Sequence, residues 1–165
     1  MIRSIDPTSS AEIELVATRM RLTLIEVLGE EQGGAMYTMD WLKDRVLFHL
    51  DPEKSTAQIY LAVDDGAIIN GHTIVRIEDD GSGKKFGLFS TTYVEPDSRK
   101  KGLADSLLNR GEKWMLDQGL TEAQTYTSDS NTKLIELYFK HGYRITERAP
   151  EKSMVLLAKS LVQSP

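Results

Sequence analysis

The chain has 165 residues with 20 basic and 25 acidic side chains, a formal net charge of −5 and no cysteine. This length predicts one domain, spanning residues 1–165, and the absence of cysteine excludes a disulfide framework, a thiolate zinc site and a cysteine nucleophile. The mild acidity argues against nucleic acid as a partner, and the lack of an apolar run of about 18 residues argues against a membrane-spanning helix. The polar N-terminus is unlike a secretory signal, so we expect a cytoplasmic protein with no membrane partner.

Two helices are predicted in the N-terminal region. Apolar residues recur at helical spacing after Ser9 or Ser10, either of which can cap a first helix. Gly29 and the Gly33-Gly34 pair end that pattern, so we expect a turn there. The second helix is expected to start after the cap Thr38 and to end at Asp51-Pro52. The helical region as a whole is expected to span residues 1–52.

The middle of the chain changes to the alternating period of β-strands. Ile59, Leu61 and Val63 alternate with other residues, as in a strand with one buried face. Two further runs follow after turns rich in Asp and Gly, and short turns join antiparallel neighbours. The sequence therefore predicts a meander of three strands, at 59–63, 69–77 and 86–94, the last of which is stopped by Pro96.

After Pro96 the order becomes helix, strand, helix, strand, strand. The strand–helix–strand step from Phe86 to Thr127 predicts a right-handed crossover between parallel strands. We therefore expect an α/β (α+β) domain with a mixed sheet, in which residues 57–158 form the sheet and the core. The expected elements of this half are a helix at 103–115 closed by Gly119, strands at 123–127, 143–146 and 154–158, a helix at 131–141 and a frayed tail at Val162–Pro165.

The stretch between a strand end at Val94 and a helix start near Gly102 has the composition of an anion-binding loop. Arg99, Lys100 and Lys101 are basic in an otherwise acidic chain. The first turn of a helix carries unpaired N–H groups and a partial positive charge, and a diphosphate can accept hydrogen bonds from those groups. Glycine lets the backbone approach an anion closely. A solvated surface loop is the alternative interpretation of the same residues.

The pattern Arg99-x-x-Gly102-x-Ala104, placed after a strand and a proline, resembles the acetyl-CoA motif of the GNAT N-acetyltransferase family. In that family Gln or Arg is followed by two residues, Gly, one residue and Gly or Ala. The predicted order of elements is also similar to the family's order across nearly the whole chain. The resemblance implies a mixed, mostly antiparallel central sheet of about six to seven strands flanked by about four helices. It also implies acetyl-CoA as co-substrate, bound by Tyr93, Val94, Arg99, Lys100, Lys101, Gly102, Leu103 and Ala104.

A second constellation lies in the helix that starts at Asn131. From the residues alone, Asn131 is an N-cap and Tyr138 is a packed aromatic residue. An Asn that opens a helix, followed by Leu-Tyr and then by Gly142 and an aromatic residue, is similar to a second signature of the GNAT family. The resemblance implies that Asn131 contacts the cofactor and that Tyr138 lies near the thioester sulfur as the general acid.

The resemblance implies an N-acetyltransferase that moves an acetyl group from acetyl-CoA to a primary amine. Because the chain offers no cysteine nucleophile and no evident Ser-His pair, we expect direct attack in a ternary complex. In the family, the strand before the basic loop splays from its parallel neighbour and holds the pantetheine arm. By position, Thr92, Tyr93 and Val94 would supply backbone groups to that arm, with an N–H near Val94 as the oxyanion donor.

The general base is not assigned by the sequence. Some members of the family carry a Glu on the strand before the basic loop, where this chain has Leu88 and no carboxylate. His72, Glu78 and Glu95 are candidate substitutes, and a water relay is the alternative. The histidines of the chain lie far apart and have no metal-ligand spacing, so no metal is expected.

The acceptor is predicted only as a small-molecule or peptide amine, bound on the side of the N-terminal helical region. Glu26, Glu30 and Glu31 could favour a cationic amine or form a solvated helix end. A non-catalytic acyl-CoA-binding or sensor module of the same fold is the alternative function, and a general phosphoanion binder is a third. Many relatives are homodimers, so a homodimer remains open.

Overall fold

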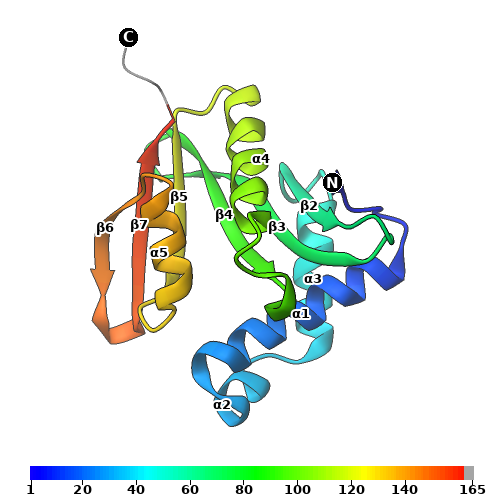
Figure 1. Cartoon of the computed structure of the whole chain (residues 1–165). Helices are drawn as coiled ribbons and strands as arrows, with labels where there is room; N and C mark the ends of the chain where they lie inside the picture. The colour runs from blue at the N-terminus through cyan, green and yellow to red at the C-terminus, as the bar shows by residue number, and fades with distance from the viewer. Residues whose placement is uncertain (162–165) are drawn as a thin grey trace.

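Seven strands and five α-helices make up residues 1–161, the part of the chain that this computed structural model describes (Figure 1). The N-terminal part contains β1 (Ile2–Ser4), α1 (Ser10–Leu28), α2 (Glu30–Ala35) and α3 (Met39–Leu50). The meander consists of β2 (Ala57–Val63), β3 (Ile69–Asp79) and β4 (Lys85–Val94). The remaining elements are α4 (Leu103–Asp117), β5 (Glu122–Ser128), α5 (Thr132–Lys140), β6 (Arg144–Ala149) and β7 (Met154–Ser160). The tail expected at Val162–Pro165 lies outside the described residues.

The helices α1 and α3 start at the caps that the sequence predicts. The Ser9 hydroxyl accepts a hydrogen bond from the backbone N–H of Glu12 at 3.2 Å, and the Thr38 hydroxyl accepts one from the N–H of Trp41 at 3.0 Å. Each bond satisfies one of the N–H groups that a helix start leaves unpaired. α1 ends at Gly29, whose φ of 90° lies in the left-handed region. These local signals confirm the predicted starts of both helices and the predicted end of α1.

The turn predicted at the Gly33-Gly34 pair is wrong, because both glycines lie inside α2. α2 packs on α1 so closely that a Cβ atom on Gly33 would lie 2.4 Å from the carbonyl oxygen of Leu24. Glycine has a low helix propensity, and the contact with α1 outweighs that propensity here. The absence of a Cβ atom at Gly33 is therefore a condition of this packing.

Gly33→Ala is expected to destabilise the chain by about 1–3 kcal/mol, because the backbone of α1 cannot move aside as a flexible side chain would. Gly34→Ala is the matched control, since the nearest atom to a Cβ there is Ile25 Cδ1 at 4.0 Å and alanine favours the helix. Urea unfolding of the two variants measures the difference. If both variants proved equally stable, the close approach of α2 to α1 would be contradicted.

The strands form one sheet in the order β1-β2-β3-β4-β5-β7-β6. β4 and β5 are parallel, and all other neighbours are antiparallel. This arrangement confirms the predicted meander, the parallel step and the mixed α/β (α+β) fold class, with α2 as an addition to the expected helices. β1 was not predicted, because a strand of 3 residues is too short to show a period.

Helices cover both faces of the sheet at β2. Ile59 and Leu61 belong to a core that includes residues of α1 and α3, whereas Tyr60 and Ala62 belong to a second core that includes residues of α4 and α5. Successive side chains of a strand point to opposite faces, and both sets are buried here. The single buried face predicted for this strand is therefore wrong. Over residues 1–161, no helix is both long and apolar enough to cross a bilayer.

β4 and β5 separate after three residue pairs, of which the last joins Phe89 to Thr125. β4 nevertheless continues to Val94. At the same point the register of β4 against β3 shifts and leaves Ser90 as an extra residue. A bulge of this kind bends the strand that carries it. Beyond Phe89, one backbone edge of β4 is therefore without β5 as a hydrogen-bonding partner.

Candidate functional site

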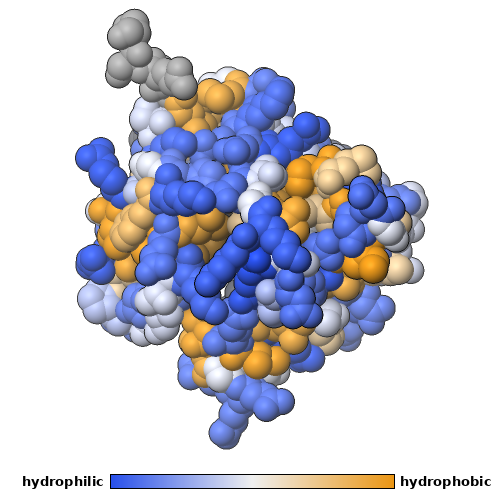
Figure 2. Space-filling view, in the orientation of Figure 1, coloured by the Kyte–Doolittle hydropathy of each residue, from blue (hydrophilic) through white to orange (hydrophobic). Residues whose placement is uncertain are grey.

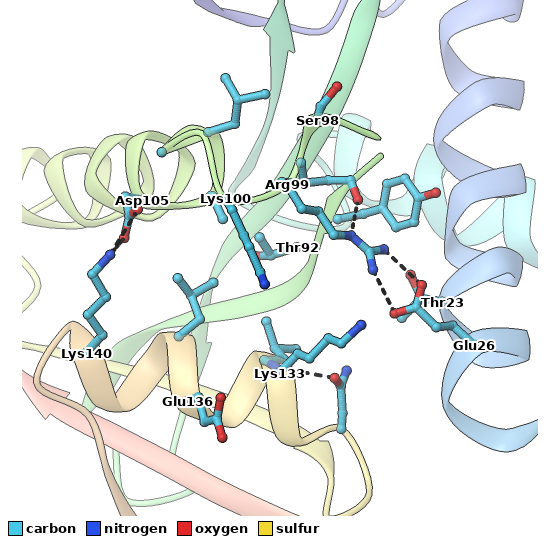
Figure 3. A pocket seen from close by; sticks show the side chains of 18 residues that line it. Thr23, Glu26, Thr92, Ser98, Arg99, Lys100, Asp105, Lys133, Glu136 and Lys140 are labelled. Atoms are coloured by element: carbon cyan, nitrogen blue, oxygen red, sulfur yellow. Dashed lines mark hydrogen bonds and ion pairs between the residues drawn. The ribbon is translucent and has the colours of Figure 1, made fainter. Parts of the chain in front are cut away.

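A cavity of about 460 Å³ lies between α1, the end of β4, the start of α4 and α5 (Figure 3). In the view of Figure 1, hydrophilic side chains gather over the middle of the face between α5 and α1 (Figure 2). Two of the predicted site residues, Lys101 and Tyr138, are not among the residues that line the cavity. The predicted site residues that do line it are Tyr93, Val94, Arg99, Lys100, Gly102, Leu103, Ala104 and Asn131.

The loop before α4 leaves backbone N–H groups open at the cavity. The first hydrogen bond of α4 runs from the N–H of Ser106 to the carbonyl of Gly102 at 3.0 Å, so the N–H groups of residues 103–105 have no partner inside the helix. Gly102 has a φ of 82°, which favours glycine, and no atom lies within 4 Å of the position of its missing Cβ. The backbone at the start of α4 is therefore accessible to an anion.

The free edge of β4 also offers backbone groups to the site. The N–H of Glu95 donates to the carbonyl of Asn70 at 2.8 Å, and Tyr93, two residues earlier, faces β3 in the same way. Because hydrogen bonding alternates along an antiparallel pair, the N–H and C=O groups of Thr92 and Val94 point away from β3. Tyr93 was also expected to offer its backbone to the pantetheine arm, but its N–H and C=O groups face β3 instead.

Arg99 ties the loop to α1. Its Nε donates to the carbonyl of Val94 at 2.8 Å, and its Nη1 and Nη2 donate to the two carboxylate oxygens of Glu26 at 3.0 and 2.9 Å (Figure 3). A bidentate pair of arginine and carboxylate is strong and fixes the relative orientation of its members. The guanidinium is therefore directed toward α1 rather than toward the start of α4. The charge of Glu26, a sequence candidate for attracting a cationic amine, is compensated by this pair.

A buried polar cluster surrounds Tyr93. The ring of His72 stacks on the Tyr93 ring at a centroid distance of 6.0 Å, and the guanidinium carbons of Arg19 and Arg99 lie 5.7 and 5.8 Å from the same ring centre. His72 is fully buried, and neither ring nitrogen has a hydrogen-bond partner among residues 1–161. Burial, assisted by the charge of Arg19, lowers the pKa of His72 to about 3. The imidazole is therefore neutral and does not line the cavity.

The two carboxylates considered as bases are engaged with arginines. Glu95 lies 2.9 Å from the Nε of Arg19, and Glu78 forms an ion pair with Arg76. Neither carboxylate lines the cavity. In the described part of the chain, no group of three or more His, Cys, Asp or Glu side chains could hold a metal ion.

Tyr138 is buried behind the cavity wall. Its ring packs on Tyr143 and Phe89 at centroid distances of 4.9 and 5.9 Å, and only 1% of the residue is exposed. Burial raises the pKa of Tyr138 to about 12, while hydrogen bonds with the hydroxyls of Thr92 and Thr125 act in the opposite direction. Thr92 itself lines the cavity. The Tyr138 hydroxyl thus borders the site through Thr92.

The N-terminal half of α5 forms the wall opposite the loop. Asn131 caps the helix, because its Oδ1 accepts a hydrogen bond from the N–H of Leu134 at 3.3 Å, and it also lines the cavity. The other lining residues of this wall were not predicted, although they recur every three or four positions, the spacing that places side chains on one helix face. Those residues are Lys133, Leu134, Glu136, Leu137 and Lys140, and α1 adds Thr23.

A cluster of charged groups joins the start of α4 to the end of α5. Asp105 lies 2.7 Å from the Nε2 of His141 and 3.2 Å from the Nζ of Lys140. The hydrogen bond with His141, together with Lys140, holds the pKa of Asp105 below its usual range. The two walls of the cavity are therefore connected at its far end by an ionised carboxylate.

The sequence matches the family model described as "Acetyltransferase (GNAT) family" over residues 23–143. It is similar to the mycothiol acetyltransferase of Thermobispora bispora, with 28% identity over 114 residues, which are 68% of this chain and 37% of that protein. The chain therefore spans little more than a third of the length of that relative.

Several solved structures share the arrangement of helices and strands. The PaiA N-acetyltransferase of Thermoplasma acidophilum in complex with coenzyme A has a TM-score of 0.75 at 17% identity, covering 97% of this chain and 98% of the other. An aminoglycoside 6′-N-acetyltransferase complexed with coenzyme A has a TM-score of 0.74 at 18% identity, covering 100% and 99%. Ard1 from Thermoplasma volcanium has a TM-score of 0.72 at 17% identity, covering 99% and 98%. At these identities the likeness shows a shared fold.

Proposed function

The chain belongs to the GNAT acetyltransferase family, and from that premise we propose that it moves an acetyl group from acetyl-CoA to a primary amine by direct attack in a ternary complex. One observation carries the proposal: the unpaired N–H groups at the start of α4 and the free backbone edge of β4 meet in one cavity. The N–H groups suit a diphosphate, and the free edge suits an extended arm that bears amides. Coenzyme A carries both groups.

In the proposed complex the diphosphate lies against the backbone of residues 102–104, and Lys100 adds positive charge beside it. The pantetheine arm pairs with the outward-facing backbone groups of Thr92. The outward-facing N–H of Val94 is the proposed oxyanion donor, while the Val94 carbonyl accepts from Arg99. We assign Arg99 the role of holding the loop on β4 and α1.

Tyr138 is the proposed general acid for the departing thiolate. A thiol has a pKa of about 8.5, whereas the pKa of Tyr138 is about 12, so proton donation is uphill and depends on placement. Thr92, which lies between Tyr138 and the cavity, is the proposed carrier of that proton. The amine loses its own proton through water in this proposal, because none of the candidate bases lines the cavity.

A second candidate function is a non-catalytic acyl-CoA-binding or sensor module. The position of Tyr138 outside the cavity lining favours it, because a general acid must reach the leaving group. The two functions share one binding site and differ in turnover alone.

Calorimetric titration with CoA, followed by a thiol-release assay with acetyl-CoA and an amine panel, tests the proposal. The panel contains an aminoglycoside, a diamine and short peptides, the first because a structural relative is an aminoglycoside 6′-N-acetyltransferase. We expect saturable CoA binding and thiol release that depends on at least one amine. Binding without release across the panel favours the module, and an absence of CoA binding contradicts both functions.

A further inference from the structure

Some of the charged side chains that line the cavity have no oppositely charged partner beside them in the part of the chain that the structure describes. Arg99 is paired with Glu26 at 2.9 Å, and Lys140 is paired with Asp105 at 3.2 Å. Both pairs lie at the margins of the cavity, one against α1 and one at the end of α5 (Figure 3). The charged lining residues that remain are Lys100, Lys133 and Glu136.

Lys100 extends from the loop before α4 toward α5, and Lys133 extends from the first turn of α5 toward α1, so both side chains line the same cavity (Figure 3). Neither ammonium group has an ion-pair partner among residues 1–161. Glu136 is directed away from both (Figure 3). Two cations thus share one space in a protein of net charge −5. Because a cleft with uncompensated charge of one sign attracts the opposite sign, this arrangement favours an anion in the cavity.

The wall that carries Lys133 is held in place from both ends of α5. At the start, Asn131 caps the helix, and at the end His141 contacts Asp105 of α4 at 2.7 Å. Because α4 follows directly on the loop of Lys100, the two lysines are fixed on walls that are joined to each other. The fold therefore fixes the two walls relative to each other, while the lysine side chains themselves are exposed.

We propose that Lys133 is a phosphate-binding residue, which contacts from α5 the same anionic part of the co-substrate that Lys100 contacts from the loop. This inference rests on the proposed function, since it takes CoA as the ligand. The shared chemistry is a phosphate group, and CoA contains two kinds, the diphosphate and the 3′-phosphate. Lys133 makes its contact as a point charge, and its loss removes a charge-assisted hydrogen bond.

Lys133→Ala in the full chain is expected to weaken CoA binding about tenfold, the lower end of the range for a hydrogen bond to a charged group. Lys113→Ala is the matched control, because Lys113 is an exposed lysine of α4 that pairs with Asp117 and does not line the cavity. Calorimetry at two salt concentrations adds a second readout, since the loss of one cation makes CoA binding less sensitive to salt. Lys133→Arg should restore most of the affinity.

Titration with 3′-dephospho-CoA identifies the phosphate. A tenfold loss that persists with dephospho-CoA assigns Lys133 to the diphosphate, and a loss that disappears assigns it to the 3′-phosphate, and both results support the inference. Equal CoA affinity in the wild type and Lys133→Ala overturns it while leaving the proposed function intact. A wild type that does not bind CoA at all overturns the proposed function, and the inference with it.

Discussion

Replacing Tyr138 by phenylalanine is expected to lower kcat by roughly 10²–10⁴-fold, the usual range for loss of a general acid, with little change in CoA affinity. The ring that packs on Tyr143 and Phe89 is kept, so the fold and the cavity survive the change. The hydroxyl beside Thr92 is lost, and with it the proposed proton source for the thiolate. Single-turnover measurement of thiol release separates this chemical step from binding.

Tyr143→Phe is the control for Tyr138→Phe, because it removes another tyrosine hydroxyl from the same core. The Tyr143 hydroxyl donates to a carboxylate oxygen of Glu112 at 2.8 Å, and neither residue lines the cavity. This variant should lose stability but keep its kcat. An unchanged kcat in Tyr138→Phe would remove Tyr138 from the mechanism and leave solvent as the proton donor.

The pH profile of kcat gives an independent check on the same residue. With a pKa of about 12, Tyr138 keeps its proton throughout the ordinary assay range. Deprotonation of this acid should therefore cause no fall in kcat up to roughly pH 10, about two units below that pKa. A descending limb between neutral pH and that point, present in the wild type and absent in Tyr138→Phe, would contradict the raised pKa.

Acidification from about pH 6.5 to pH 4 is expected to remove several kcal/mol from the free energy of unfolding, through two buried histidines. Burial, with the nearby Arg19, lowers the pKa of His72 from 6.5 to about 3. Burial is also the main cause at His49, whose pKa falls to about 4, with the charges of Arg76 and Arg45 adding to it and a hydrogen bond to the Arg45 backbone opposing it. In this range the unfolded chain binds protons that the folded chain does not.

The stability that His72 and His49 contribute is fully present above pH 6.5 and is lost as the pH falls toward their folded values, at about 1.4 kcal/mol per pH unit for each group. Urea unfolding at a series of pH values measures the slope. His72→Phe keeps an aromatic ring against Tyr93 but cannot titrate, so its slope should be shallower by about one histidine, and His49→Phe should act likewise. A slope equal to that of the wild type in both variants would show that these rings are protonated in the folded chain.

Most of the fold could be predicted because its signals are local. The hydroxyls of Ser9 and Thr38 cap helices within three residues of themselves, and such caps stand out in the sequence. α2 could not be predicted, because the packing that holds Gly33 lies against Leu24 of another helix. The second buried face of β2 was also missed, because the helices that cover Tyr60 and Ala62 come from a distant part of the chain.

The candidate site likewise contains residues that a local sequence pattern indicates and residues that only distant contacts bring into place. The loop and the glycine before α4 follow directly on a strand, so their place in the fold can be read from the sequence. The partner of Arg99 is Glu26, 73 residues earlier, and no local pattern indicates that pairing. Lys133 looks like any lysine on a solvated helix face, and only the position of α5 opposite the loop turns its side chain into the cavity. Contacts between residues far apart in the chain are therefore the part of the site that the sequence does not indicate.

Glu26 and Arg99 pair across the cavity although they are 73 residues apart in the chain. Ligand binding in the cavity should therefore also stabilise the folded state. These walls come together only after α1 has docked beside the end of β4, so a nucleotide that fits between them selects the native state and has no site on the denatured chain. By mass action, such a ligand at a hundred times its dissociation constant adds about 2.7 kcal/mol to the free energy of unfolding. The concentration of that ligand would then set the fraction of unfolded chain as well as the rate of catalysis.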